Sequence, residues 1–337
     1  MTNRQEKRYI SIRDIAEISG ASIATVSRVI NNPGQVSTHT QKKVLDVINK
    51  YGYVPYRGLT NISSGASNTI AIFVFDIMNP FFSNIITHLS RITFENNYSL
   101  LICNAENDYE KELKYYEYCK GMRVGGIIYT SGSTRTEPPV SERLSVPTVI
   151  MATSENIQKD RYVINSDHMK SMRLLVDYLY NLGHRIIGFI SGASSFLPAT
   201  DRLNAFKCNM DRYGLECPEE YIYYGDFYMK SGVKAFDFFY SQGKMPTAII
   251  SANDQMAKGF IMRANYLGVR IPDDISLCGI DAIENDYFYP KITSIKQNTE
   301  LFAQKAFELI INSDKIKPPQ EIILDVSIEI GSTCRKI

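Results

Sequence analysis

Hydrophobic residues recur at helical spacing in three segments near the start of this 337-residue chain. Each segment begins with a Ser or Thr, residues that are favoured as helix N-caps, and Gly20 and the Pro33-Gly34 pair end the first two. The apolar positions are Ile12, Ile15, Ala16 and Ile18, then Val26, Val29 and Ile30, and finally Val44, Leu45 and Ile48. Two short helices joined by a tight turn that contains Gly form a helix-turn-helix, so the pattern predicts an all-α head.

Beyond residue 66 the pattern changes to short apolar runs separated by helical segments. The runs occupy residues 69–76, 98–105, 124–130, 147–153, 185–192, 221–226, 247–254 and 274–281. Alternation of buried strands and helices is typical of parallel sheets with crossover helices. Two such series predict two α/β lobes. Residues 322–337 read as further strands and show no heptad repeat, which favours a dimer over a coiled-coil tetramer.

Composition places the chain among ordinary globular proteins. It contains 44% hydrophobic and 22% charged residues, no apolar run of eighteen residues, and no apolar core of a signal peptide in the first thirty residues. The six Cys residues form no C-x-x-C pair and have no His partner at metal-binding spacing. We therefore expect a cytoplasmic protein with reduced cysteines, without a membrane segment, metal site or cofactor.

Charge is distributed unevenly between the head and the rest of the chain. Residues 1–60 carry nine Lys or Arg and four acidic residues, a net charge of +5, whereas the remainder carries −4. A basic head on a mildly acidic body suggests a polyanionic partner for the head. The segment 55–69 between them is rich in Gly and Ser, a composition typical of a flexible tether.

The second helix of the head has the features of a DNA-reading helix. In a helix-turn-helix its N-terminal residues enter the major groove, where Arg can bind guanine and small apolar side chains can contact thymine methyl groups. The predicted DNA contacts are Ser22, Ile23, Ala24, Thr25, Ser27, Arg28 and Asn31, with Thr40 at the phosphates. The alternative is a three-helix protein-interaction bundle whose charge is incidental.

The head also resembles a known family. The stretch that carries the resemblance reads IRDIAEISGASIATVSRVINNPGQVSTHTQKKVLDVINKYGYVP, and it is similar almost position for position to the DNA-binding head of the LacI/GalR (lactose/galactose repressor) family. The resemblance continues to near the C-terminus. It implies a helix-turn-helix domain at 1–56, a hinge at 57–66, and a two-lobed body like the periplasmic sugar-binding proteins at 67–337. Lobe 1 would span about 67–165 and 298–321, and lobe 2 about 166–297 and 322–337.

Polar residues follow several of the predicted strands, where open α/β sheets bind ligands. They are Asp76, Asp167, Asn253, Asp254 and Asp281. The resemblance implies that a small-molecule effector, which we expect to be a sugar or a sugar derivative, is held between the lobes by further residues at family positions. These are Asn79, Phe81 and Phe82 of the NPFF motif, together with Arg202, Phe227, Asn253, Asp281 and Gln297. Arg and Asp suit vicinal hydroxyl groups, and an aromatic face suits a sugar ring.

Several of these residues also have a purely structural interpretation. Asp254 could be the N-cap of the next helix, Phe81 and Phe82 could belong partly to the core, and Gln297 could brace a crossover between the lobes. The family commonly reads D-N-x-x-G at the entry to the second lobe, but here His168 follows Asp167 and Ser171 replaces the Gly. We interpret this His as a residue of a surface or a helix start.

The hinge departs from the family pattern as well. Family members carry a short helix here that folds on DNA and wedges a Leu into the minor groove. In this chain Leu59 and Ile62 would lie on one side of such a helix, with Ile62 as the wedge, although Gly58 weakens the helix.

These features together predict a transcriptional regulator. One head reads too few base pairs to find a site in a genome, so we expect a homodimer on a palindromic double-stranded operator. No sequence motif of a catalytic nucleophile, phosphate cradle or dinucleotide site was found, so we expect no enzymatic activity and no catalytic residues. The alternative is a solute-binding or sugar-processing protein, which would lack the helix-turn-helix.

Overall fold

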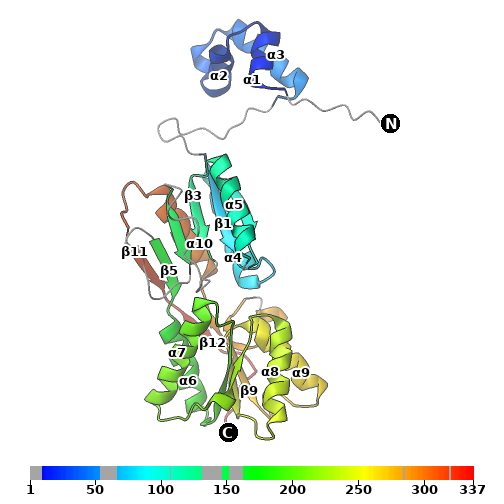
Figure 1. Ribbon diagram of the computed structural model, residues 1–337, viewed down its shortest axis with the longest axis vertical. Coiled ribbons are helices and arrows are strands. Elements are labelled where there is room, and N and C mark those ends of the chain that lie inside the picture. The colour runs from blue at the N-terminus through cyan, green and yellow to red at the C-terminus, as the bar shows by residue number, and fades with distance from the viewer. Residues whose placement is uncertain are drawn as a thin grey trace, which may run out of the picture. The chain divides into compact units, whose positions relative to one another are not determined.

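The protein is described by a computed structural model that covers residues 10–53, 67–106, 108–130, 146–151, 162–283, 285–318 and 320–337. The chain divides into two units, Met1–Ile62 and Ser63–Ile337. Figure 1 shows the small helical head and the larger α/β body. The predicted hinge at 57–66, with Leu59 and Ile62, lies outside the described residues.

Three helices and one 3-10 turn form the head: α1 (Ile12–Ser19), α2 (Ile23–Asn31), η1 (Pro33–Gln35) and α3 (Thr38–Tyr51). Ser side chains cap all three helices, and in α1 the cap is a full capping box with Asp14. Gly20 and Gly52 end α1 and α3 in the left-handed conformation, as C-cap glycines do. The predicted helix-turn-helix head is confirmed.

A small apolar core holds these helices together. Its buried members are Ile15, Ala16, Val26, Val29 and Val44. The prediction that Leu45 belongs to the core is wrong, since Leu45 is 36% exposed, and Ile18, another apolar position of the pattern, is 45% exposed. Both lie at the margin of the apolar stripe of a short helix, where a three-helix core is too narrow to cover them.

The body consists of two lobes, each built on a six-stranded sheet. Lobe 1 comprises β1 (Thr69–Val74), α4 (Pro80–Glu95), β2 (Ser99–Asn104), α5 (Tyr109–Met122), β3 (Gly126–Tyr129), β4 (Thr148–Met151), β5 (Tyr162–Ser166), α10 (Thr299–Ile311) and β11 (Gln320–Leu324). Its strand order is β11-β5-β4-β3-β1-β2, and all the pairs are parallel. The strand order changes direction at β1, because β2 lies on one side of β1 and all the later strands lie on the other. Such a reversal is typical of doubly wound folds.

Lobe 2 repeats the plan. It comprises α6 (His168–Asn181), β6 (Ile187–Ser191), α7 (Leu197–Arg212), η2 (Glu219–Tyr221), β7 (Ile222–Tyr224), α8 (Met229–Ser241), β8 (Ala248–Ser251), α9 (Asp254–Tyr266), β9 (Ser276–Asp281), η3 (Asn285–Tyr287), β10 (Thr293–Lys296) and β12 (Ser327–Glu329). The strand order is β12-β10-β9-β8-β6-β7. In Figure 1, α6 and α7 lie on one side of this sheet, and α8 and α9 lie on the other. The predicted two-lobed α/β body is therefore confirmed.

The chain crosses between the lobes three times, after β5, after β10 and after β11. The last crossing lies later than the predicted position near residue 321, because β11 pairs with β5 as far as Leu324 and Ser166. The final strand, β12, also departs from the expected parallel pattern. It pairs with β10 in the antiparallel direction at the edge of the second sheet, directly after the crossing. No described helix has the length and apolar character that crossing a membrane would require.

Candidate functional site

The first turn of α2 is fixed by a local cap. The Ser22 hydroxyl accepts a hydrogen bond from the Thr25 backbone N–H at 3.1 Å, and the two side-chain hydroxyls are 2.8 Å apart. This cap leaves Ser22, Ile23 and Ala24 exposed, and 47% of the surface of Ile23 is accessible. The turn therefore presents small polar and apolar side chains to a partner.

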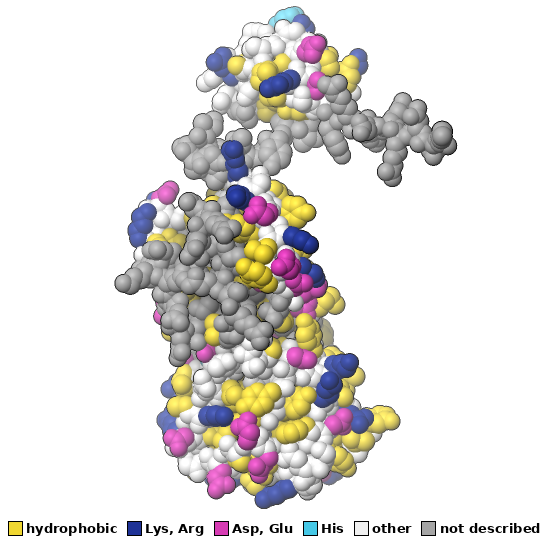
Figure 2. Space-filling view, viewed as in Figure 1, with side chains coloured by type: hydrophobic (Ala, Val, Ile, Leu, Met, Phe, Trp, Pro, Cys, Tyr) yellow, Lys and Arg dark blue, Asp and Glu magenta, His cyan; other side chains and the backbone are white. Residues whose placement is uncertain are grey.

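The opposite side of α2 is anchored in the head core through Val26 and Val29. Arg28 is consequently exposed, while Thr25 and Ser27 are half-buried. Lys and Arg side chains protrude from several parts of the visible face of the head (Figure 2). The side chain of Asn31 is not among those that the structure describes.

At the start of α3, Thr40 is half-buried. Its backbone N–H donates to the Ser37 hydroxyl at 3.3 Å. The side chains predicted to contact DNA from α2 and α3 thus lie close to capped helix N-termini.

A cavity lies between the two lobes of the body, where the carboxyl ends of both sheets meet. Its free volume is about 50 Å³. It is lined by Phe75, Asn79, Phe81, Phe82, Thr130, Met151, Ser166, His168, Phe196, Pro198, Arg202, Phe227, Asn253, Asp281, Gln297 and Phe302. The lining combines several aromatic rings with a small set of polar groups, as is typical of small-molecule sites.

Arg202 brings a buried charge to this cavity. It extends from α7, is 6% exposed, and donates from Nη1 to the Ala252 carbonyl oxygen at 2.5 Å. Its Nε has no hydrogen-bond partner among the described residues. Burial lowers the pKa of the guanidinium group, and the nearby Asp281 carboxylate opposes this effect. An unpaired buried N–H is costly, so a ligand that accepts a hydrogen bond here would be stabilised.

Asp281 belongs to a chain of hydrogen bonds that joins the lobes. Gln297 donates from Nε2 to Asp281 Oδ1 at 2.7 Å, and the Ser166 hydroxyl donates to Gln297 Oε1 at 2.5 Å. Ser166 ends a strand of lobe 1, and Asp281 ends a strand of lobe 2. Gln297 therefore braces the crossover and also lines the cavity.

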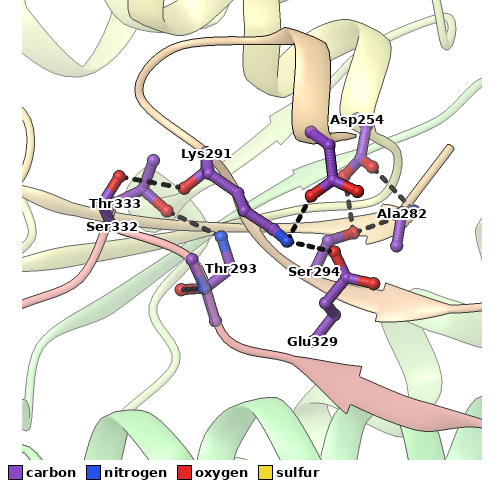
Figure 3. Close-up of polar contacts among 10 residues, drawn as sticks. Asp254, Ala282, Lys291, Thr293, Ser294, Glu329, Ser332 and Thr333 are labelled. Atoms are coloured by element: carbon purple, nitrogen blue, oxygen red, sulfur yellow. Dashed lines mark hydrogen bonds and ion pairs between the residues drawn. The ribbon is translucent and has the colours of Figure 1, made fainter. Parts of the chain in front are cut away.

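The backbone that presents Asp281 is strained and is held by Asp254. Asp281 and Ala282 have φ values of 122° and 52°, which side chains rarely adopt. One Asp254 oxygen accepts from the Ala282 N–H at 2.8 Å, and the other accepts from the Ser294 hydroxyl at 2.8 Å (Figure 3). The Asp254 carboxylate also lies against Gly279, where an added Cβ would be 2.0 Å from Oδ1.

Burial raises the pKa of both carboxyl groups. The pKa of Asp254 rises to about 8, chiefly through burial and secondly through the neighbouring Asp281. The pKa of Asp281 rises to about 6 through burial, an effect that Arg202 and the Gln297 hydrogen bond oppose. These carboxyl groups are thus poised to hold protons near neutral pH.

Aromatic rings fill much of the space between the lobes. Phe75 of lobe 1 lies 5.2 Å from Phe196 of lobe 2, measured between ring centroids, and Phe196 lies 5.6 Å from Phe227. Phe227 has a φ of 70°, and its ring covers Gly192 so closely that a Cβ there would be 2.1 Å from the ring. The rings of Phe75, Phe196 and Phe227 therefore form one aromatic cluster that extends from lobe 1 to lobe 2.

His168 is the first residue of α6 and also lines the cavity. Burial, and secondly the charge of Arg202, lower its pKa to about 3. The imidazole ring is neutral at physiological pH, and it offers one donor and one acceptor to a ligand.

Eight of the ten side chains predicted to bind the effector line the cavity: Asn79, Phe81, Phe82, Arg202, Phe227, Asn253, Asp281 and Gln297. Asp76 and Asp167 are not among the lining residues. Their carboxylates accept from the backbone N–H groups of Met78 at 2.9 Å and Lys170 at 2.7 Å, so both are engaged in local turns and caps. For the eight that line it, contact with an effector stays a prediction.

The helix cap expected from Asp254 is provided by Asn253 instead. Its side-chain oxygen accepts from the Met256 N–H at 3.0 Å, and its Nδ2 donates to the Phe227 carbonyl oxygen at 2.9 Å. The sequence did not predict the other eight lining residues, namely Phe75, Thr130, Met151, Ser166, His168, Phe196, Pro198 and Phe302. Phe75, Thr130, Met151 and Ser166 end or follow strands and could have been found by that criterion. In the described ranges no cluster of three His, Cys, Asp or Glu side chains could hold a metal ion.

Comparison with known families divides the chain in the same way. Residues 11–56 match the model of bacterial regulatory proteins, lacI family. Residues 176–334 match the periplasmic binding protein-like domain. The first match corresponds to the head, and the second covers most of lobe 2 together with α10 and β11 of lobe 1.

Individual relatives match over nearly the whole length. The HTH-type transcriptional repressor PurR of Vibrio vulnificus is 31% identical over 333 residues, which cover 97% of this chain and 99% of the relative. A crystal structure of the lac repressor dimer bound to operator and the anti-inducer ONPF matches with a TM-score of 0.81 and 25% identity, over 97% of this chain and all of the other.

A periplasmic binding protein/LacI transcriptional regulator from Alkaliphilus metalliredigens complexed with D-xylulofuranose matches with a TM-score of 0.70 and 25% identity, over 80% of this chain and 99% of the other. The helix-turn-helix, the two lobes and the relatives agree. The chain therefore belongs to the lacI family of bacterial regulatory proteins and is a DNA-binding transcriptional regulator.

Proposed function

We propose that this protein is a repressor that binds a palindromic operator as a homodimer, and that a sugar bound between its lobes controls its operator affinity. The observation that carries the effector part is the cavity itself. Arg202, with an unpaired buried N–H, and Asp281 lie there among aromatic rings. That combination suits a ligand with hydroxyl groups around an apolar face.

The DNA contacts follow from the exposed part of α2. Arg28 is exposed beyond the core side of the helix and can reach guanine O6 and N7. Ile23 and Ala24 are exposed at its start and can contact thymine methyl groups. Ser22 and Thr40 sit at capped helix N-termini, which favour phosphate oxygens.

The choice of a sugar is supported by both the lining and the solved relatives. Charged groups that make paired hydrogen bonds suit vicinal hydroxyls, whereas Phe227 and Phe196 provide flat apolar faces. The solved regulator from Alkaliphilus metalliredigens holds D-xylulofuranose. The operator and anti-inducer in the lac repressor structure support the same arrangement of a DNA site and a ligand site.

The small volume of the cavity links ligand binding to movement of the lobes. The cavity has about 50 Å³ of free volume, whereas pockets that hold small molecules typically measure about 300 to 1,000 Å³. Binding therefore requires the lobes to separate or rings such as Phe196 to move. A ligand that selects a different arrangement of the lobes changes operator affinity, and linkage requires the operator to change ligand affinity equally. Both induction and corepression follow this scheme.

We also propose that the cavity binds without catalysing a reaction. With a pKa of about 3, His168 is a weak base that does not exchange protons effectively near neutral pH. Asp281 and Asp254 are engaged by Gln297, Ser294 and a backbone N–H. The lacI-type head argues against the alternative of a solute-binding or sugar-processing protein.

Two measurements on the full-length protein test this proposal. Selection from a random double-stranded DNA library should recover a palindromic sequence, because each head of the dimer reads one half-site. A thermal-shift screen of monosaccharides, disaccharides and nucleosides should then identify a sugar. Recovery of a site without two-fold symmetry would contradict the dimer, and stabilisation by nucleosides alone would contradict the sugar.

A further inference from the structure

Two thiols in lobe 2 lie close enough to form a disulfide bond. The Sγ atom of Cys278, in β9, is 3.4 Å from the Sγ atom of Cys334, near the C-terminus. A disulfide has an S–S distance of about 2.0 Å, so the sulfur atoms need to approach by roughly 1.4 Å. Small side-chain rotations can supply such a movement.

Hydrogen bonds on both sides fix the position of the C-terminal segment next to β9. The Leu277 N–H donates to the Thr333 carbonyl oxygen at 2.9 Å, and the Thr333 hydroxyl donates back to the Leu277 carbonyl oxygen at 2.6 Å. The Thr293 N–H donates to the Thr333 hydroxyl at 2.9 Å (Figure 3). Neighbouring hydrogen-bonded chains lie about 5 Å apart, which is within the Cα separation that a disulfide bridges.

The two thiols differ in access and in acidity. Cys278 is fully buried, whereas Cys334 is only half-buried. A hydrogen bond from the Cys278 thiol lowers the pKa of Cys334, an effect that burial opposes, while burial raises the pKa of Cys278. An oxidant therefore meets Cys334 first and in its more reactive form.

We propose that Cys278 and Cys334 form a reversible disulfide when the protein meets a hydroperoxide. The Cys334 thiolate attacks one peroxide oxygen, which breaks the O–O bond, leaves Cys334 as a sulfenic acid and, for hydrogen peroxide, releases hydroxide. The Cys278 sulfur then attacks the Cys334 sulfur, the S–S bond forms and water leaves. In total, two thiols and one hydrogen peroxide give one disulfide and two water molecules.

The bond would fasten the last residues of the chain to the strand that carries Asp281. Cys278 lies three positions before Asp281 in β9, and 56 positions separate the two cysteines. Closing so long a loop restricts the unfolded chain, so the oxidised protein should be more stable than the reduced one. The proposal does not depend on the DNA site or on the identity of the effector.

A second thiol pair in lobe 1 provides an internal comparison. Cys103 in β2 and Cys119 in α5 share a hydrogen bond, but both are fully buried. Neither sulfur is open to a dissolved oxidant, so this pair should stay reduced under the conditions that oxidise the first. Comparing the two pairs therefore shows whether disulfide formation requires only neighbouring thiols or also a thiol that the oxidant can reach.

The test treats the full-length reduced protein with an equal amount of hydrogen peroxide, blocks the remaining thiols by alkylation and maps the peptides without reduction. We expect a linked pair of peptides that contains Cys278 and Cys334 and that dithiothreitol separates. We also expect the melting temperature to rise by roughly 5 to 10 °C and to fall back on reduction.

Two variants serve as controls. Cys334→Ser changes only a half-buried side chain and should remove both the linked peptides and the rise in melting temperature, while Cys103→Ser should retain them. The proposal is overturned if Cys278 and Cys334 are recovered as alkylated thiols, or if Cys334 proceeds to sulfinic acid with Cys278 still reduced. It is overturned as well if the link forms without any gain in stability.

Discussion

At the scale of single residues, burial is the main cause of the shifted pKa values of three ionisable side chains in the body. Asp254 is 4% exposed and lies close to Asp281, and burial raises the pKa of both. Arg202 is the nearby cation, and burial disfavours its charged form as well. The protonation states of the three groups are therefore coupled, and a change of one side chain alters the pKa values of the other two.

Asp254 should make the stability of the body fall with pH. Its folded pKa of about 8 exceeds its ordinary value of 3.8, so the stabilisation is complete below about pH 4 and is lost as the pH rises to about 8. Asp254→Asn, which imitates the protonated carboxyl group, should remove a slope of about 1 kcal/mol per pH unit between pH 6.5 and 8.

The measurement is urea unfolding followed by circular dichroism at several pH values, since the chain contains no Trp to report by fluorescence. The lowered pKa of His168 also contributes to the pH dependence, and this contribution declines above pH 6.5 and is common to the wild type and the variant. Equal slopes for the wild type and Asp254→Asn would show that Asp254 does not hold a proton in the folded state.

Asp281 should be required for the effector response and not for DNA binding. Asp281→Ala removes the acceptor of the Gln297 hydrogen bond and the carboxylate nearest to the Arg202 charge. Operator affinity without sugar should stay unchanged, whereas the sugar that stabilises the wild type should no longer alter it. Asp211→Ala, at an exposed position of α7, serves as the matched control. Normal sugar affinity in Asp281→Ala would place the ligand site elsewhere.

Residues that end a strand could be predicted to line the cavity, and Asp281 and Asn253 are examples. Asp76 and Asp167 satisfy the same criterion but do not line the cavity, although their side chains accept from backbone N–H groups two or three residues onward just as the side chain of Asn253 does. A strand end and a helix cap look alike in sequence because both favour Asp and Asn. Phe196 could not be predicted, since it lies in a loop before α7 and its contact with Phe75 joins residues of different lobes that are far apart in the sequence.

At the scale of elements, the inner strands were the most predictable parts because each is a short apolar run buried on both faces, as in β3 and β8. The antiparallel pairing of β12 with β10 could not be predicted, since strand direction depends on where the chain re-enters lobe 2. Helix α2 was predictable as well. Its Ser22 cap and its buried Val26 and Val29 determine which side chains remain exposed.

Arg28 in this helix should provide base discrimination. Arg28→Ala should cost roughly 1 to 3 kcal/mol at the selected operator and should relax the preference at one base pair. Binding to a set of operators with single base changes measures both effects. Arg173→Ala, at an exposed position of α6 in the body, should leave affinity and preference unchanged. An Arg28→Ala variant with unaltered base preference would remove Arg28 from the set of reading residues.

The hinge allows a prediction from sequence alone, because residues 57–66 lie outside the described part of the chain. If Ile62 wedges between base pairs at the centre of the operator, Ile62→Gly should weaken operator binding and reduce the effector response. Ser64→Gly changes the same segment without removing an apolar side chain and serves as the control. Unchanged binding and response in Ile62→Gly would identify the segment as a plain linker.

At the scale of the whole molecule, charge is separated between a head with a net charge of +5 and a remainder with −4. Phosphate contacts by the head release counterions from DNA, so the logarithm of the operator affinity should fall linearly with the logarithm of salt concentration.

Lys42 is exposed in the first turns of α3, next to Thr40. Lys42→Gln should weaken binding to all sequences alike and reduce the slope by about 0.9. Lys244→Gln, at an exposed position of lobe 2, should leave the slope unchanged. Fluorescence anisotropy with the selected operator, measured from low to high salt, distinguishes the two variants. An affinity independent of salt would contradict phosphate contacts by the head. An equal loss of slope in both variants would mean that the net charge of the molecule, and not a contact at Lys42, sets the salt dependence.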